Sequence, residues 1–167
     1  LEGVAFLHEH KVVHRDLKPA NILIVKHGGK ITPVIIDFGL SKSVDETSFN
    51  NSFTGGTRRY SAPEQLQGGQ PLKFNVDLWS YGVIVYELFT GKPLFSADSG
   101  ASDSEQTEKE IFDKITKGNV GSLHKVPEKW RKVVERCLVV DTEKRVQNVD
   151  ELFEILDDYN GDNGDNR

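Results

Sequence analysis

The chain has 167 residues, enough for one domain with a buried core, and its 26 aspartates and glutamates outnumber its 21 lysines and arginines. The formal net charge of −5 argues against a general nucleic-acid-binding protein, which would show a basic excess. No apolar run approaches the length of a membrane span. We therefore expect neither a nucleic-acid partner nor a membrane.

Two rare residue types add to this picture. Cys137 is the single cysteine, so a disulfide within the chain is impossible. A reducing compartment, cytoplasmic or otherwise intracellular, is the expectation that fits this usage. The chain contains no methionine and starts with Leu1, which predicts that it is a piece of something longer.

The first half of the chain predicts a helix, a hairpin and a loop. Residues 1–10 carry apolar side chains at helical spacing, which indicates an amphipathic helix. Two β-branched runs, ILIV at 22–25 and ITPVIID at 31–37, flank the turn sequence KHGGK and predict a β-hairpin. Pro33 favours an edge position or an irregular start for the second strand. Residues 41–57 are polar without periodicity and predict a long loop.

The second half predicts helices. Residues 77–90 are apolar nearly all round, which is typical of a buried helix. Asp77 can cap the start of this helix and Gly91 its end. Three further stretches predict helices, over about 107–117, 128–138 and 149–159. The expected fold is mainly α with a small β-hairpin over residues 1–159, followed by a disordered polar tail at 160–167.

The segment HRDLKPAN at 14–21 holds groups that suit phosphoryl transfer from ATP. Asp16 can orient an attacking hydroxyl and accept its proton, and Lys18 can offset charge on the moving phosphoryl group. Asn21 can supply an oxygen ligand to Mg²⁺, a hard cation for which a second carboxylate is expected nearby. Asp37, at the end of the second predicted strand, meets that expectation, because the hairpin would bring it back beside Asn21.

Three motifs follow one another along the chain: His-Arg-Asp-Leu with Asn21, then Asp-Phe-Gly at 37–39, then Ala-Pro-Glu at 62–64. This set resembles the signature of the eukaryotic protein kinases, of the serine/threonine type. From residue 1 to about residue 159 the sequence looks like their C-terminal lobe. The resemblance implies a mainly α, protein-kinase-like C-lobe with the hairpin beside the catalytic loop. It also implies ATP with Mg²⁺ and a protein hydroxyl as the reactants.

The resemblance implies roles for single residues. Asp16 is similar to the catalytic base of the family, and Lys18 to the lysine that contacts the γ-phosphate. Asn21 and Asp37 resemble the two residues that hold the metal. Thr57 resembles the threonine that bonds to the catalytic Asp and Lys in serine/threonine kinases.

Further resemblances concern support and regulation. Glu64 and Arg145 occupy the positions of a buried ion pair, and Asp77 that of an aspartate that bonds to the catalytic-loop backbone. His14 and Phe38 resemble a packed pair that couples the catalytic loop to Asp-Phe-Gly.

Arg15 resembles the arginine that receives a phosphorylated residue of the activation loop. Thr54, or next Ser52, is the residue we predict to be phosphorylated, since a phosphate pairs strongly with arginine.

Simpler interpretations stay open. Arg15 could be a surface charge, and Glu64 and Arg145 could each be solvated, because sequence separation alone does not pair them. Asp77 could be only a helix cap, or both a cap and a support.

Nothing in the sequence resembles the nucleotide clamp of the family. No G-x-G-x-x-G followed by valine occurs, and no lysine strand of the VAIK type can be placed. Because these parts clamp the ATP phosphates, we predict that an N-terminal lobe is missing and that the chain alone is inactive. The sequence thus favours a fragment of an active serine/threonine kinase, since Asp16 and Asp37 are retained. The alternative is a lobe-only or pseudokinase module that acts by binding.

Overall fold

The computed structural model describes the backbone of residues 1–37, 42–43, 56–69, 71–97 and 104–162. Phe38, Ser52 and Thr54, the side chain of Thr57, and residues 163–167 of the predicted tail lie outside the described residues.

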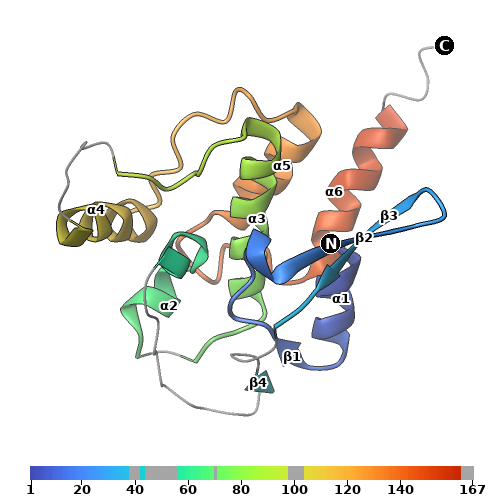
Figure 1. Cartoon of the computed structure of the whole chain (residues 1–167). Coiled ribbons are helices and arrows are strands. Elements are labelled where there is room, and N and C mark those ends of the chain that lie inside the picture. The colour runs from blue at the N-terminus through green and yellow to red at the C-terminus, as the bar shows by residue number, and fades with distance from the viewer. Residues whose placement is uncertain (38–41, 44–55, 70, 98–103, 163–167) are drawn as a thin grey trace.

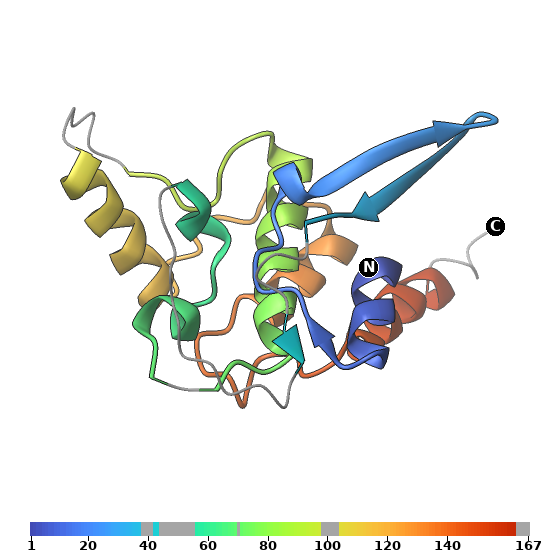
Figure 2. The ribbon, with the colours of Figure 1, turned by 60° about the horizontal axis from the view of Figure 1, so that its bottom comes forward.

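The described part of the chain is mainly helical, as predicted. Its helices are α1 (Glu2–Glu9), α2 (Pro63–Gln67), α3 (Asn75–Thr90), α4 (Ser104–Thr116), α5 (Glu128–Cys137) and α6 (Val149–Asp162), with short 3-10 turns η1 (Pro19–Asn21) and η2 (Gly56–Tyr60). Helix α3 runs through the middle and packs against α5, with α2 and α4 on one side and α1 and α6 on the other (Figures 1 and 2). Residues 14–21, called the catalytic loop after the resemblance above, lie next to this central helix, since Asp77 of α3 bonds to the backbone of His14 and Arg15.

Helix α3 is buried because its side chains are apolar on nearly every face. It ends as predicted: Gly91 has a left-handed φ of 65° and its N–H donates to the Glu87 carbonyl at 2.8 Å. The predicted cap at its start is wrong. The helix begins at Asn75 after Phe74, so Asp77 lies inside the first turn and does not cap it. Gly82 allows α5 to approach closely, since an added Cβ would lie 2.6 Å from the Cys137 Cβ.

The predicted hairpin is present as strands β2 (Ile22–His27) and β3 (Lys30–Ile35), paired antiparallel from Ile22 with Ile35 to His27 with Lys30. Its turn is shorter than the predicted KHGGK loop, because Gly28 and Gly29 alone make it, with φ of 55° and 81°. Pro33 sits in a strand with a single described neighbour, which confirms the edge position. The hairpin extends away from the helices in both views (Figures 1 and 2).

Several elements had no counterpart in the sequence analysis. Strand β1 (Val12–Val13) pairs with β4 (Lys42–Ser43), and α2 follows directly on the Ala-Pro-Glu motif. Helix α6 continues to Asp162, beyond the expected boundary at residue 159.

Among the described residues, no helix combines the length and the apolar character needed to cross a membrane.

Candidate active site

The loop between β1 and η1 gathers three of the predicted site residues. The Lys18 ammonium nitrogen lies 2.7 Å from Asp16 Oδ2. The Asn21 side-chain amide donates to the same oxygen at 3.1 Å and to the Asp16 backbone carbonyl at 2.8 Å. The Asp16 carboxylate is therefore held in place by a cation and an amide from the same short loop. Its other oxygen, Oδ1, is enclosed and accepts no hydrogen bond from the described residues.

The hairpin carries Asp37 back towards Asn21. The Asn21 carbonyl accepts a hydrogen bond of 2.9 Å from the Ile36 N–H, immediately beyond the last strand pair. Asp37 follows with a left-handed φ of 64°, and its side chain lies at the surface. The predicted neighbours Asn21 and Asp37 are thus brought together along the backbone.

The chemistry of this pair fits Mg²⁺. The Asn21 amide nitrogen makes both of its bonds to Asp16, so the nitrogen is turned towards Asp16. The Asn21 Oδ1 atom is then available as an oxygen ligand for a metal ion. Among the described residues, no group of three or more His, Cys, Asp or Glu side chains lies close enough together to hold a metal ion. One amide oxygen and one carboxylate suit Mg²⁺, which keeps several waters and shares its coordination with phosphates.

Asp77 anchors the start of the catalytic loop to the central helix. Its carboxylate accepts the His14 N–H at Oδ2 and the Arg15 N–H at Oδ1, both at 2.8 Å. The side chain is 1% exposed, so these bonds replace the water that burial removes. Since Asp77 does not cap α3, support of the loop backbone is what its carboxylate does.

His14 connects the loop to the residue before Asp37. It is fully buried. Its Nδ1 accepts the Asp16 N–H at 3.3 Å, which leaves the proton on Nε2 to bond to the Ile36 carbonyl at 3.2 Å. The ring therefore ties the backbone of the catalytic loop to the end of the hairpin.

Gln65 is a site neighbour that the sequence analysis missed. Its Nε2 donates to the Arg15 carbonyl and its Oε1 accepts the Ala62 N–H, both at 2.9 Å. It thereby joins the Ala-Pro-Glu segment to the catalytic loop. No sequence signal marked it, because a glutamine in a short helix follows no recognisable pattern.

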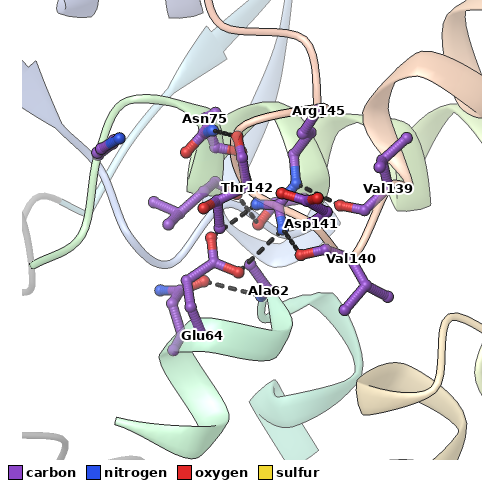
Figure 3. A network of polar contacts seen from close by, with 12 residues as sticks. Ala62, Glu64, Asn75, Val139, Val140, Asp141, Thr142 and Arg145 are labelled. Carbon is purple, nitrogen blue, oxygen red and sulfur yellow. Dashed lines mark hydrogen bonds and ion pairs between the residues drawn. The ribbon is translucent and has the colours of Figure 1, made fainter. Parts of the chain in front are cut away.

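Glu64 and Arg145 form a buried, two-pronged ion pair (Figure 3). Arg145 Nη1 and Nη2 lie 2.6 and 2.9 Å from the two Glu64 carboxylate oxygens. The Arg145 side chain is 0% exposed, and its Nε donates to the Val139 carbonyl at 2.8 Å. The guanidinium also lies 5.0 Å above the Trp79 ring. The interpretation that these two side chains are solvated is therefore wrong.

Two pKa shifts lie near these supports. Burial and the hydrogen bond to Glu87 raise the pKa of Tyr60 to about 12. The Glu143 backbone N–H and the Lys144 ammonium lower the pKa of Asp141, in the turn that precedes Arg145.

Comparison with known proteins agrees with this geometry. The family model described as protein kinase domain matches residues 1–155. The chain belongs to the protein kinase family. A probable cell division protein kinase of Encephalitozoon cuniculi is 36% identical over 160 residues, which cover 95% of this chain. A serine/threonine-protein kinase of Protochlamydia amoebophila is 34% identical and also covers 95% of this chain.

A third kinase matches a shorter region. Inhibitor of nuclear factor kappa-B kinase subunit alpha of Gallus gallus is 44% identical over 89 residues, or 53% of this chain. The matched regions make up 59%, 17% and 12% of the three relatives in turn. The chain therefore spans only part of the length of the kinases it matches.

Proposed function

We propose that this chain is the catalytic C-terminal lobe of a protein serine/threonine kinase. In this proposal it transfers the γ-phosphate of ATP to a protein serine or threonine when an N-terminal lobe completes the nucleotide site. The observation that carries the proposal is the Asp16 carboxylate, held by Lys18 and Asn21 within one loop. The name of the Protochlamydia amoebophila relative and Lys18 in the loop support the serine/threonine assignment.

Each loop residue has a part in the transfer. Asp16 orients the substrate hydroxyl and accepts its proton as the oxygen–phosphorus bond forms. Lys18 offsets negative charge on the phosphoryl group that moves. Asn21 Oδ1 and the Asp37 carboxylate would hold Mg²⁺, which when bound supplies charge neutralisation at the phosphates.

The nucleotide clamp is proposed to come from a segment outside these 167 residues, since no glycine-rich phosphate loop occurs in them. The chain alone is then expected to bind Mg-ATP weakly, because Asn21 and Asp37 offer few contacts to the nucleotide. Calorimetric titration of the chain with Mg-ATP checks this, and low-micromolar affinity would contradict it.

The function is tested by phosphate transfer. The chain is compared with a two-lobe form, in which a kinase N-terminal lobe precedes Leu1, using labelled ATP and a mixed protein substrate. We expect transfer by the two-lobe form alone, with label on serine and threonine. Asp16→Asn should abolish transfer, whereas Asp158→Asn, at an exposed site on α6, should not. A folded two-lobe form that binds ATP and transfers nothing would favour the binding-module alternative.

Regulation forms a separate part of the proposal. Phosphorylation of Thr54, or next of Ser52, would raise activity by pairing with Arg15. The test compares wild type with a Ser52→Ala, Thr54→Ala double variant, after phosphatase treatment and again after autophosphorylation. Equal rates in all four samples would remove this switch.

A further inference from the structure

The hairpin differs in charge from the rest of the chain. No aspartate or glutamate occurs between Asp16 and Asp37, whereas this stretch holds three lysines. Two of them, Lys26 and Lys30, flank the turn together with His27, and all three side chains are exposed. Neither lysine forms an ion pair with an acidic side chain among the residues that the structure describes. On a chain of net charge −5, the hairpin tip is therefore a small basic area.

The register of the hairpin decides which of its backbone groups face outward. The Ile36 N–H donates to the Asn21 carbonyl at 2.9 Å, one step beyond the pair of Ile22 with Ile35. In an antiparallel ladder, hydrogen-bonded pairs alternate with pairs whose N–H and C=O groups point away from the partner strand. The residues with outward-pointing backbone groups are therefore Ile22, Ile24 and Lys26 on β2, with Ile31, Pro33 and Ile35 on β3.

The two edges of the hairpin differ in what they offer to an added strand. Pro33 has no N–H, so the outer edge of β3 lacks a donor at its middle. The outer edge of β2 presents the N–H and C=O groups of Ile24 and Lys26, and β3 is the only neighbour of β2 among the described strands. Proteins shield such edges with proline, with charge or with a covering segment. Strand β2 has no proline and a single lysine, so its edge is open at Ile24.

Apolar side chains line this edge on both faces of the hairpin. Successive side chains of a strand point to opposite faces. Ile24 is 53% exposed on one face, and Leu23 and Val25 are 52% and 40% exposed on the other. The hairpin extends away from the helices (Figures 1 and 2). A strand added beside β2 would therefore gain backbone hydrogen bonds, apolar contacts along its length and positive charge at the tip.

We propose that the outer edge of β2 docks an extended segment of a partner protein. The segment has β-branched side chains beside Ile24 and acidic side chains beside Lys26 and His27. In the antiparallel orientation, which pairs slightly more strongly, its acidic end is N-terminal, because β2 runs towards the basic tip. Strand addition of this kind takes its affinity from backbone bonds and its specificity from alternate side chains. This docking site goes beyond phosphoryl transfer and does not depend on it.

The probe is a fluorescein-labelled peptide with blocked ends, Glu-Glu-Thr-Val-Thr-Val, and its matched control is Lys-Lys-Thr-Val-Thr-Val. Both are titrated against the wild-type chain by fluorescence anisotropy, at concentrations where light scattering shows a monomer. We expect the acidic peptide to bind about ten-fold more tightly at low salt, since two attractive cross-strand pairs replace two repulsive ones. High salt should shrink that difference. Equal affinity for the two peptides, or binding of neither, would overturn the proposal.

Two proline substitutions separate the two edges. Ile24→Pro and Ile31→Pro each remove one exposed isoleucine and one outward-pointing N–H, the first on β2 and the second on β3. Ile24→Pro should weaken binding of the acidic peptide about ten-fold, because a backbone bond is lost, whereas Ile31→Pro should change it by about two-fold or less. Replacing Lys26 and Lys30 together by Gln should weaken it about five-fold at low salt. Equal effects of the two proline substitutions would overturn the proposal.

A measurement on the wild-type chain covers the case in which a proline variant does not fold. Amide hydrogen exchange is followed with and without the acidic peptide. Exchange at the Ile24 and Lys26 N–H groups should slow when the peptide is added, because both groups gain an acceptor, while exchange at Ile31 should stay the same. Slowing at Ile31 in place of Ile24, or at neither residue, would overturn the proposal.

Two other occupants of this edge predict different results. If a second copy of the chain pairs with β2, Ile24→Pro should abolish self-association in light scattering and the peptide should not bind. If an N-terminal lobe covers the edge, the two-lobe form should lose the peptide binding that the chain shows. Either result would overturn the proposal, and peptide binding by both forms would support it. Binding needs no phosphate transfer, so a failure of the kinase function leaves this test intact.

Discussion

The centre of the molecule and the hairpin differ in which side chains they bury and which they expose. Around α3 the buried charged side chains are paired: Arg145 with Glu64, and Asp77 with the catalytic-loop backbone. On the hairpin, apolar side chains lie in the open, with Leu23, Ile24 and Ile31 between 52% and 61% exposed. The residues that hold the catalytic loop in place are therefore all within this chain. The hairpin, in contrast, exposes an apolar surface of the kind that favours association.

The ion pair gives the largest expected effect. Arg145→Ala leaves the Glu64 carboxylate buried without its partner, so we expect the free energy of unfolding to fall by about 3–5 kcal/mol. Arg136→Ala is the matched control, because Arg136 and Glu151 form an ion pair of 3.1 Å at the surface, where such pairs contribute about 1 kcal/mol or less. Urea unfolding followed by circular dichroism measures both, and equal losses would contradict the ranking.

On the hairpin, substitutions should change association of the chain and leave its stability almost unchanged. Ile24→Thr with Ile31→Thr keeps β-branched side chains on one face of the ribbon and lowers its apolar exposure. We expect the wild-type chain to associate at high concentration and the double variant to do so less, with unfolding free energy changed by about 0.5 kcal/mol or less. Light scattering measures association, with Val140→Thr as the control for an exposed apolar residue elsewhere. A wild-type chain that stays monodisperse would count against this picture.

The reactivity of Cys137 in the wild-type chain measures how tightly α3 and α5 are packed, without any substitution. Burial raises the pKa of its thiol to about 12, and the thiolate is the reactive form. Alkylation of the native chain should therefore be slow at neutral pH and become fast only with unfolding. Rapid labelling of a chain whose circular dichroism remains native would show that α3 and α5 open locally.

Tyr60 should give the smallest effect. Its pKa is about 12 in the folded chain and its usual value is 10.0, so the unfolded chain loses the proton first as pH rises. Its contribution to stability is then fully present below pH 10 and is lost between pH 10 and 12. Tyr60→Phe should remove that part of the decline in unfolding free energy. An unchanged pH profile in the variant would mean that other groups cause the decline.

The sequence predicted the elements with strong local patterns. The pattern of apolar residues located α1, α3, α4, α5 and α6 to within a few residues, and two glycines between β-branched runs located the hairpin. Helix α2 was missed because its five residues start at a proline and are too few to show a period.

The same distinction applies to the candidate site. Asp16, Lys18 and Asn21 lie within one short segment, so their motif could be read directly. Gln65 bonds to the loop across 50 residues of sequence, and no local pattern signals such a contact. Two roles were expected for Asp77. The helix cap is wrong, whereas the bonds to the backbone of His14 and Arg15, which the resemblance implied, are present.

The most direct test of the central claim separates chemistry from nucleotide binding in the two-lobe form. Asp16→Asn and Asp37→Asn are compared by transfer rate and by calorimetric affinity for Mg-ATP. If Asp16 is the base and Asp37 a metal ligand, Asp16→Asn abolishes transfer with nearly unchanged affinity, whereas Asp37→Asn impairs both. An Asp16→Asn enzyme that keeps most of the wild-type kcat would contradict the account.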